Sequence, residues 1–181
     1  MRTFVSFALV NCFAGVLVMG KLPPPGGPQS LPIESFDALK TIAKFEYLVS
    51  ISDSDNDTNF ECLSARRQDF DPESHTVTYV WTFPSTGEEV PFHAKTGDTP
   101  GTFSVTVAGD PTEMEAVIYY TNYENCVVGD VDYHGHQCSL WVKREVKDAV
   151  PQDCIDHFVD TCGVIVPPHS RDLCSDGEGD Y

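Results

Sequence analysis

The chain has few basic residues and, beyond residue 20, no long apolar run. Its 181 residues include 11 Lys and Arg against 28 Asp and Glu, which gives a formal net charge of −17. Such a surface repels the phosphates of nucleic acids and the headgroups of anionic membranes. A helix that spans a bilayer needs about 20 apolar residues. The composition therefore argues against a nucleic-acid partner and against membrane insertion.

Recognisable catalytic motifs are also missing. The sequence has no Gly-x-Ser-x-Gly elbow, no His-Glu-x-x-His pair, no Walker loop and no dinucleotide fingerprint. His134, His136 and Cys138 form a His-x-His-x-Cys cluster, but the two histidines flank Gly135 in a predicted turn, and Cys138 has other cysteines to pair with. We predict no enzyme activity, no cofactor and no metal site.

The N-terminal region has the pattern of a secretory leader. Residues 4–18 are almost wholly apolar, they follow Arg2, and a Pro- and Gly-rich segment covers 21–32. This pattern is typical of a signal peptide, which we place at 1–20. The protein is therefore expected to be secreted, extracellular and soluble. The sequon that begins at Asn56 predicts a surface glycan.

Seven cysteines are present, and Cys12 lies in the predicted signal peptide. The other six are expected to form disulfides, because secreted chains mature in an oxidising compartment. Four of them crowd together and two flank the bulk of the chain: Cys126, Cys138, Cys154 and Cys162, and then Cys62 and Cys174. Six cysteines allow 15 pairings, which the residues alone leave open.

Short runs rich in Val, Thr, Tyr and Phe, separated by turn clusters, begin at residue 45 and predict β-strands. Eight such runs occur, at 45–50, 60–67, 75–83, 90–95, 103–108, 114–121, 126–133 and 137–143. A short helix is predicted before them, where Ile33, Phe36 and Ile42 recur at helical spacing after Glu34 or Ser35 as a cap. The chain is thus expected to be mostly β.

A second helix is predicted after the strands. Pro151 would open it, Cys154, Phe158 and Cys162 would share one face, and Gly163 would end it. Eight antiparallel strands can close into an up-and-down barrel, whose interior holds one small ligand. A two-sheet sandwich is the alternative. We favour the barrel because its outer wall would offer the C-terminal helix an apolar surface to pack on. The acidic tail at 175–181 is expected to be disordered.

Strand alternation predicts which side chains face the interior. Cys138 should lie under the C-terminal helix, because its sulfur must reach a helical partner, and Ser139 and Trp141 would then point inward. On the preceding strand the same rule sends Cys126 outward and Val127 inward.

Several motifs resemble those of a known family. They are residues 124–126 (Glu-Asn-Cys), 139–141 (Ser-Leu-Trp) and 150–154 (Val-Pro-Gln-Asp-Cys), with 60–62 and 172–174 around the flanking cysteines. On these motifs the chain resembles the tick salivary lipocalins of the histamine-binding-protein family. The resemblance implies a lipocalin domain at 33–174. It also implies three disulfides, which are Cys62–Cys174, Cys126–Cys154 and Cys138–Cys162.

Amine-binding members of that family usually carry an acidic residue directly after the strand cysteine and a Glu before Leu-Trp or Leu-Tyr. This chain has Val127 and Ser139 at those positions. A buried ammonium costs several kcal/mol without a compensating charge, so the two departures weaken an amine-binding interpretation. Other acidic residues are candidates to point inward, namely Glu46, Glu61, Glu115 and Asp132.

The predicted interior is rich in aromatic and aliphatic side chains, which suit a sterol, a fatty acid or an eicosanoid. Aromatic residues at alternate strand positions also fill ordinary cores, so the set as a whole counts for more than any one member. The predicted ligand-binding residues are Phe45, Tyr47, Tyr79, Trp81, Phe83, Phe103, Val105, Tyr119, Val127, Ser139 and Trp141.

The leading hypothesis is a secreted monomer that sequesters an apolar host lipid and so modulates host immune or inflammatory responses. A first alternative keeps the barrel but binds a biogenic amine, histamine or serotonin, and its mark would be inward acidic side chains. A second alternative is a module whose loops bind a host protein such as a complement component or a chemokine. Its marks would be a filled interior and an exposed patch on the loops.

Overall fold

A computed structural model of the chain describes residues 35–53, 60–163 and 174. Four expectations fall outside these described residues: the signal peptide at 1–20, the Pro- and Gly-rich segment at 21–32, the glycan at Asn56 and the acidic tail at 175–181.

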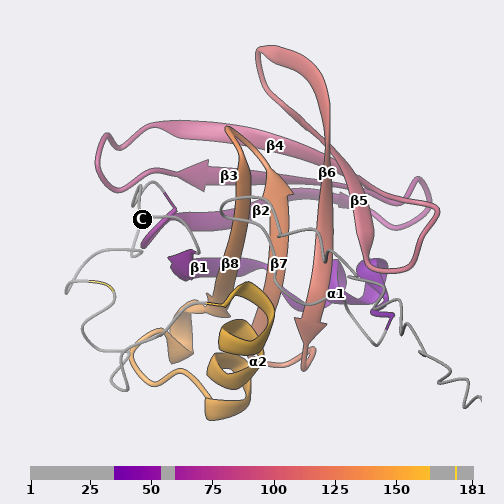
Figure 1. The fold of residues 1–181 in the computed structure, drawn as a ribbon. Coiled ribbons are helices and arrows are strands. Elements are labelled where there is room, and N and C mark those ends of the chain that lie inside the picture. The colour runs from indigo at the N-terminus through magenta and orange to yellow at the C-terminus, as the bar shows by residue number, and fades with distance from the viewer. Residues whose placement is uncertain (1–34, 54–59, 164–173, 175–181) are drawn as a thin grey trace, which may run out of the picture.

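The β-strands form one closed sheet. In chain order they are β1 (Tyr47–Asp53), β2 (Ser64–Asp71), β3 (Thr76–Thr82), β4 (Glu89–Thr96), β5 (Thr102–Val107), β6 (Asp110–Thr121), β7 (Cys126–Asp132) and β8 (His136–Lys143). Each strand pairs antiparallel with the next, and β8 pairs back with β1 (Figure 1). The predicted up-and-down barrel is confirmed, and the sandwich alternative is wrong.

This connectivity gives the barrel two distinct ends. The connections β1–β2, β3–β4, β5–β6 and β7–β8 lie at one end, which we call the loop end. The opposite end carries the other three connections and α1 (Ala38–Lys44), which directly precedes β1, and we call it the helix end. Because α1 has to turn into β1, it is held close to the mouth of the barrel at the helix end.

The helix α1 begins at Asp37, whose carboxylate accepts a hydrogen bond of 2.9 Å from the amide of Lys40. The expected caps, Glu34 and Ser35, were wrong because the helical turns start only after Asp37, which has an extended backbone. Ile42 is buried, and its carbonyl accepts a hydrogen bond of 2.5 Å from Nη1 of Arg67. This bond ties α1 to the barrel.

The helix α2 (Gln152–Cys162) follows β8 and a short 3-10 helix, η1 (Arg144–Val146). Pro151 precedes α2 and Gly163 ends it with a φ of 72°, a conformation that favours glycine. Cys154, Phe158 and Cys162 are buried on the face toward the barrel. Figure 1 shows α2 lying against β7 and β8, so the predicted C-terminal helix on the barrel wall is confirmed.

Three disulfides join Cys62 to Cys174, Cys126 to Cys154 and Cys138 to Cys162, which is the pairing that the family resemblance implied. Cys154 lies in the first turn of α2 and Cys162 is its last residue. Both ends of the helix are therefore cross-linked to adjacent strands of the wall, β7 and β8.

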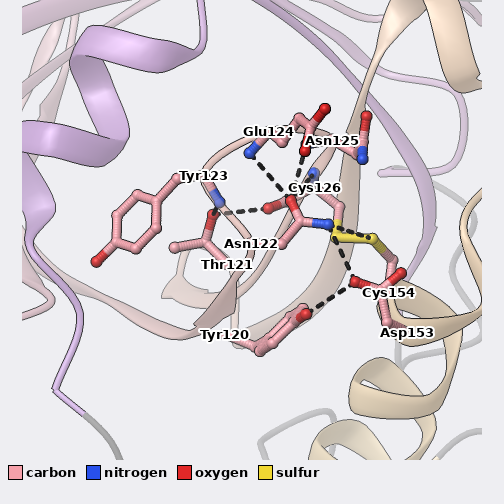
Figure 2. The surroundings of a disulfide bond; sticks show 9 residues. All are labelled: Tyr120, Thr121, Asn122, Tyr123, Glu124, Asn125, Cys126, Asp153 and Cys154. Carbon is pink, nitrogen blue, oxygen red and sulfur yellow. Dashed lines mark hydrogen bonds between the residues drawn. A yellow bond between two sulfur atoms is a disulfide. The ribbon is translucent and has the colours of Figure 1, made fainter.

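Hydrogen bonds reinforce the disulfide at the start of α2 (Figure 2). Oδ1 of Asn122 accepts hydrogen bonds from the backbone amides of Glu124, Asn125 and Cys126, at 3.1, 2.8 and 3.3 Å. Its amide nitrogen donates to Oδ2 of Asp153 over 3.1 Å. One side chain thus shapes the β6–β7 turn and also holds it to α2.

Candidate functional site

A cavity of about 170 Å³ lies inside the barrel. It is lined by Thr41, Ile42, Phe45, Leu48, Ala65, Val77, Tyr79, Trp81, Phe92, Ala94, Phe103, Val105, Ala116, Val117, Ile118, Val127, Gly129, Asp130, Val131, Ser139 and Trp141. The first three come from α1 and the residue after it, so this helix forms the floor of the cavity at the helix end.

Toward the loop end, the cavity is lined mainly by aromatic rings. Trp81 of β3 and Phe92 of β4 stack with ring centroids 3.5 Å apart and an interplanar angle of 16°. Trp141 of β8 faces Trp81 at 5.5 Å between centroids. Rings in these positions offer flat, polarisable surfaces to a flat ligand. Both tryptophans of the chain lie in the cavity wall.

Few polar side chains reach the cavity. The hydroxyl of Tyr79 donates a hydrogen bond of 2.5 Å to the carbonyl of Phe45, and burial raises the pKa of Tyr79, so the ring stays neutral. Oγ of Ser139 accepts a hydrogen bond of 2.8 Å from Nε1 of Trp141. The Ser139 hydroxyl hydrogen remains available to a ligand, since a hydroxyl can donate and accept at the same time.

Asp130 is the acidic residue in the lining, but its carboxylate belongs to the outer side of the wall. In the β7–β8 register Asp130 pairs with Cys138, which lies under α2, and Oδ2 of Asp130 is 2.7 Å from Nδ1 of His136. Burial raises the pKa of Asp130, against the hydrogen bond from His136, which lowers it. That bond raises the pKa of His136. The cavity is bordered here by backbone, beside the small residue Gly129.

Eight of the residues predicted to bind a ligand line this one cavity. They are Phe45, Tyr79, Trp81, Phe103, Val105, Val127, Ser139 and Trp141. As predicted, Cys126 and Cys138 lie in the cluster under α2, on the opposite side of the same strands. Their neighbours Val127 and Ser139 face the cavity.

Three other predicted residues lie elsewhere. Tyr47 packs with the cluster under α2, because β1 faces the cavity with Leu48 instead. Phe83 follows the end of β3 and packs at the loop end, 6.4 Å from Phe60 between ring centroids. Tyr119 falls at a register shift between β6 and β7 and is absent from the lining. Burial and then the charge of Asp130 raise the pKa of Tyr119 to about 12.

The acidic residues that were candidates to point inward do not line the cavity. Glu46, Glu115 and Asp132 are exposed, and Glu61 is half-buried outside the lining. Within the described ranges, no group of three or more His, Cys, Asp or Glu side chains is arranged to hold a metal ion. Nor does any helix among these residues have the length and apolarity needed to cross a membrane.

The sequence interpretation missed several lining residues. Phe92 and Ala94 alternate within the run 90–95, so the rule that found Trp81 and Trp141 applies to them as well. Thr41 and Ile42 had no such signal, because a helix that closes a barrel has the same pattern as any amphipathic helix.

A closed eight-stranded antiparallel barrel with an internal cavity, a helix across one end and a second helix on its wall defines a ligand-binding barrel of the lipocalin class. The sequence model of the tick histamine-binding protein family matches residues 34–168, and the chain belongs to this family.

One similar solved structure is described as the crystal structure of the AM182 serotonin complex. It has a TM-score of 0.49 and 17% sequence identity, and the match covers 70% of this chain and 83% of that chain. No curated protein matches the sequence.

Proposed function

We propose that this protein is secreted and sequesters a small host amine with an aromatic ring, of the histamine or serotonin class, by holding it inside the barrel. The observation that carries the proposal is membership of the tick histamine-binding protein family over residues 34–168. Sequestration is stoichiometric and needs no turnover.

The size of the cavity supports a small ligand. Pockets for drug-sized molecules typically measure about 300–1,000 Å³, whereas this cavity measures about 170 Å³. A molecule with one or two rings suits this space better than a sterol or an eicosanoid. The biogenic amine, which was the first alternative in the sequence analysis, is therefore preferred to the apolar lipid, which was the leading hypothesis.

The aromatic lining supports a flat, cationic ligand. Trp81, Trp141 and Phe103, which come from β3, β8 and β5, line the cavity with rings against which a ligand ring can pack. An ammonium near such faces gains about 0.5–2 kcal/mol from cation–π attraction. Burial of the ring contributes a further 25 cal/mol or so per Å² of apolar surface.

A charge partner for the ammonium is the most demanding requirement. Among the described residues, the one acidic residue in the lining is Asp130, whose carboxylate is bonded to His136, so the aromatic faces are the groups left to attract the ammonium. Replacing Trp141 by Leu should weaken serotonin binding by about tenfold or more, because it removes a stacking surface and a cation–π partner together worth about 1.4 kcal/mol or more. Asp132→Asn changes an exposed carboxylate outside the lining and is the control.

Isothermal titration with serotonin and histamine tests the proposal on the full secreted protein. We expect binding at one site, weakened by Trp141→Leu and unchanged by Asp132→Asn. Equal affinity in the parent and in both variants would remove Trp141 from the site. Failure of both amines to bind would overturn the proposed function.

A second candidate is a small apolar lipid, and the scarcity of polar side chains in the lining favours it. Native mass spectrometry with arachidonate and cholesterol in the same panel separates the two candidates. A retained lipid with no retained amine would establish this second function. No adduct of either kind would favour binding of a host protein through the loops.

A further inference from the structure

Among the residues that the structure describes, three hydroxyl side chains line the cavity, and they belong to Thr41, Tyr79 and Ser139. Two of them donate their hydrogen to the backbone, and Ser139 does not. We propose that Ser139 is a specificity-determining residue, which donates a hydrogen bond to an acceptor atom on the ring of the ligand. This role rests on the proposed function and deepens it, because it separates amines whose ring carries an acceptor, such as serotonin, from amines whose ring has none.

The hydrogen bond between Ser139 and Trp141 has a fixed direction. An indole N–H can only donate, so Oγ of Ser139 is the acceptor in the 2.8 Å bond from Nε1 of Trp141. Within the described part of the chain, the hydroxyl hydrogen of Ser139 has no acceptor. Ser139 is only 1% exposed. A buried donor without an acceptor is costly, so a ligand that supplies the acceptor is favoured.

The hydroxyls of Thr41 and Tyr79 are bonded in the opposite sense. Oγ1 of Thr41 donates to the carbonyl of Asp37 over 2.8 Å, and the hydroxyl of Tyr79 donates to the carbonyl of Phe45 over 2.5 Å. Each hydroxyl carries one hydrogen, so these two groups can only accept from a ligand. The described lining therefore offers hydroxyl acceptors beside α1 and one hydroxyl donor at Ser139.

Strand pairing places Ser139 away from α1. Phe45 directly follows α1 and comes before β1, whereas Ser139 pairs with Asp53, the last residue of β1. The donor and the two acceptors therefore belong to opposite parts of the lining. An ammonium group has no lone pair and cannot accept the hydrogen of Ser139, so the ring of the ligand is the part that suits this position.

The neighbouring indole brings the ring of a ligand close to Ser139. Ser139 and Trp141 lie on the same face of β8, and the N–H edge of the indole lies against Oγ of Ser139. A ring that packs on Trp141 therefore has its own edge near this hydroxyl. On the adjacent strand Ser139 pairs with Gly129, which has no side chain and leaves space for a ring substituent.

Isothermal titration with serotonin and tryptamine tests this bond, because tryptamine lacks only the ring hydroxyl. The parent should bind serotonin more tightly. Ser139→Ala should shift the ratio of the two affinities toward tryptamine by about tenfold, because the hydroxyl of serotonin then loses its partner. Ser139→Thr retains a hydroxyl and should keep the parental ratio. Ser104→Ala removes a serine hydroxyl outside the lining and should keep it as well.

The ratio of affinities separates recognition of the ligand from support of Trp141. If Ser139 only holds the indole in place, Ser139→Ala weakens the binding of both ligands by the same factor, and the proposed role is overturned. Equal affinity of the parent for serotonin and tryptamine would overturn it too, and this comparison requires no variant to fold.

Two ligands without an ammonium group distinguish failure of this role from failure of the proposed function. If the parent binds neither serotonin nor histamine, the proposed function fails, and hydroxyindole and indole then test Ser139 alone. A preference for hydroxyindole that disappears in Ser139→Ala would support the donor role. The absence of such a preference in the parent would overturn it.

Discussion

The outer side of β7 and β8 and the inner side of β3 and β4 are stabilised in opposite ways. The outer side is cross-linked to α2 by the disulfides Cys126–Cys154 and Cys138–Cys162. The side chains packed between α2 and these strands are almost completely buried. The inner side has no cross-link among the described residues and is packed by Trp81, Phe92 and their aromatic neighbours. Covalent constraint is thus kept away from the surfaces that would meet a ligand.

This division separates stability from recognition. On the chain-entropy account, disulfides stabilise the barrel by restricting the unfolded chain, and this effect requires no contact with the cavity. Aromatic packing stabilises only through contact, so the same rings both support the fold and shape the cavity. Residues of the inner side are therefore expected to affect folding and binding together, and residues of the outer side to affect folding alone.

The largest effect should come from the inner side. Trp81→Ala removes a ring that is stacked on Phe92 and leaves a void beside the existing cavity, so stability should fall by about 3–5 kcal/mol. Guanidinium denaturation measures the loss. Trp81→Phe retains a ring and is the control. A loss smaller than that of a disulfide would show that the inner side contributes little to the fold.

Next in size is the disulfide at the start of α2. Replacing Cys126 and Cys154 together by Ala should lower stability by about 2–4 kcal/mol and leave the strand signal in circular dichroism intact, because Cys138–Cys162 still holds the far end of α2. Ligand affinity should stay at the parental value. A large loss of affinity would contradict the separation of the two sides.

A smaller effect is expected at Asn122, which shapes the β6–β7 turn (Figure 2). Asn122→Ala leaves three backbone amides without their acceptor and should cost about 1–3 kcal/mol. Urea denaturation measures it, with Glu124→Ala in the same turn as the exposed control. Equal stability of the two variants would mean that the disulfide alone holds the turn.

The smallest effect is a dependence on pH at the pair Asp130–His136 of the outer side. The hydrogen bond to Asp130 raises the pKa of His136 above 6.5, so this pair stabilises the fold fully below pH 6.5. That contribution is lost as the pH rises through the folded-state pKa. Burial raises the pKa of Asp130 from 3.8, so stability also falls as the pH rises from 3.8 through the folded-state pKa of this group, in a separate and more acidic range. Denaturation midpoints on both sides of pH 6.5 measure the slope, which His136→Gln should reduce.

Strand alternation predicted the β7 and β8 faces well because a disulfide fixed the direction of one residue in each strand. Once Cys138 is assigned to the helix side, Ser139 and Trp141 must face the cavity. The strand β1 had no such marker, and Tyr47 was assigned to the wrong face. A shift of the strand register by one residue moves every side chain of a strand to the opposite face of the sheet. For β1 the register is set by its pairing with β2 and β8.

Two other errors came from features that a periodic pattern does not contain. Tyr119 was expected to line the interior together with its neighbour Tyr120, but it lies where the β6–β7 register shifts, which interrupts the regular alternation of faces along β6. Phe83 lies just beyond the end of β3 at Thr82, so its direction follows the loop.

Closure of the barrel also bears on the order in which the chain folds. The two disulfides of α2 span 28 and 24 residues, whereas Cys62–Cys174 spans 112. The entropy lost in joining two segments grows with the length of chain between them, and long-range pairings form slowly. We infer that β7, β8 and α2 assemble first as a local unit, and that β1 docks on β8 late. The cavity would then be the last part of the molecule to form.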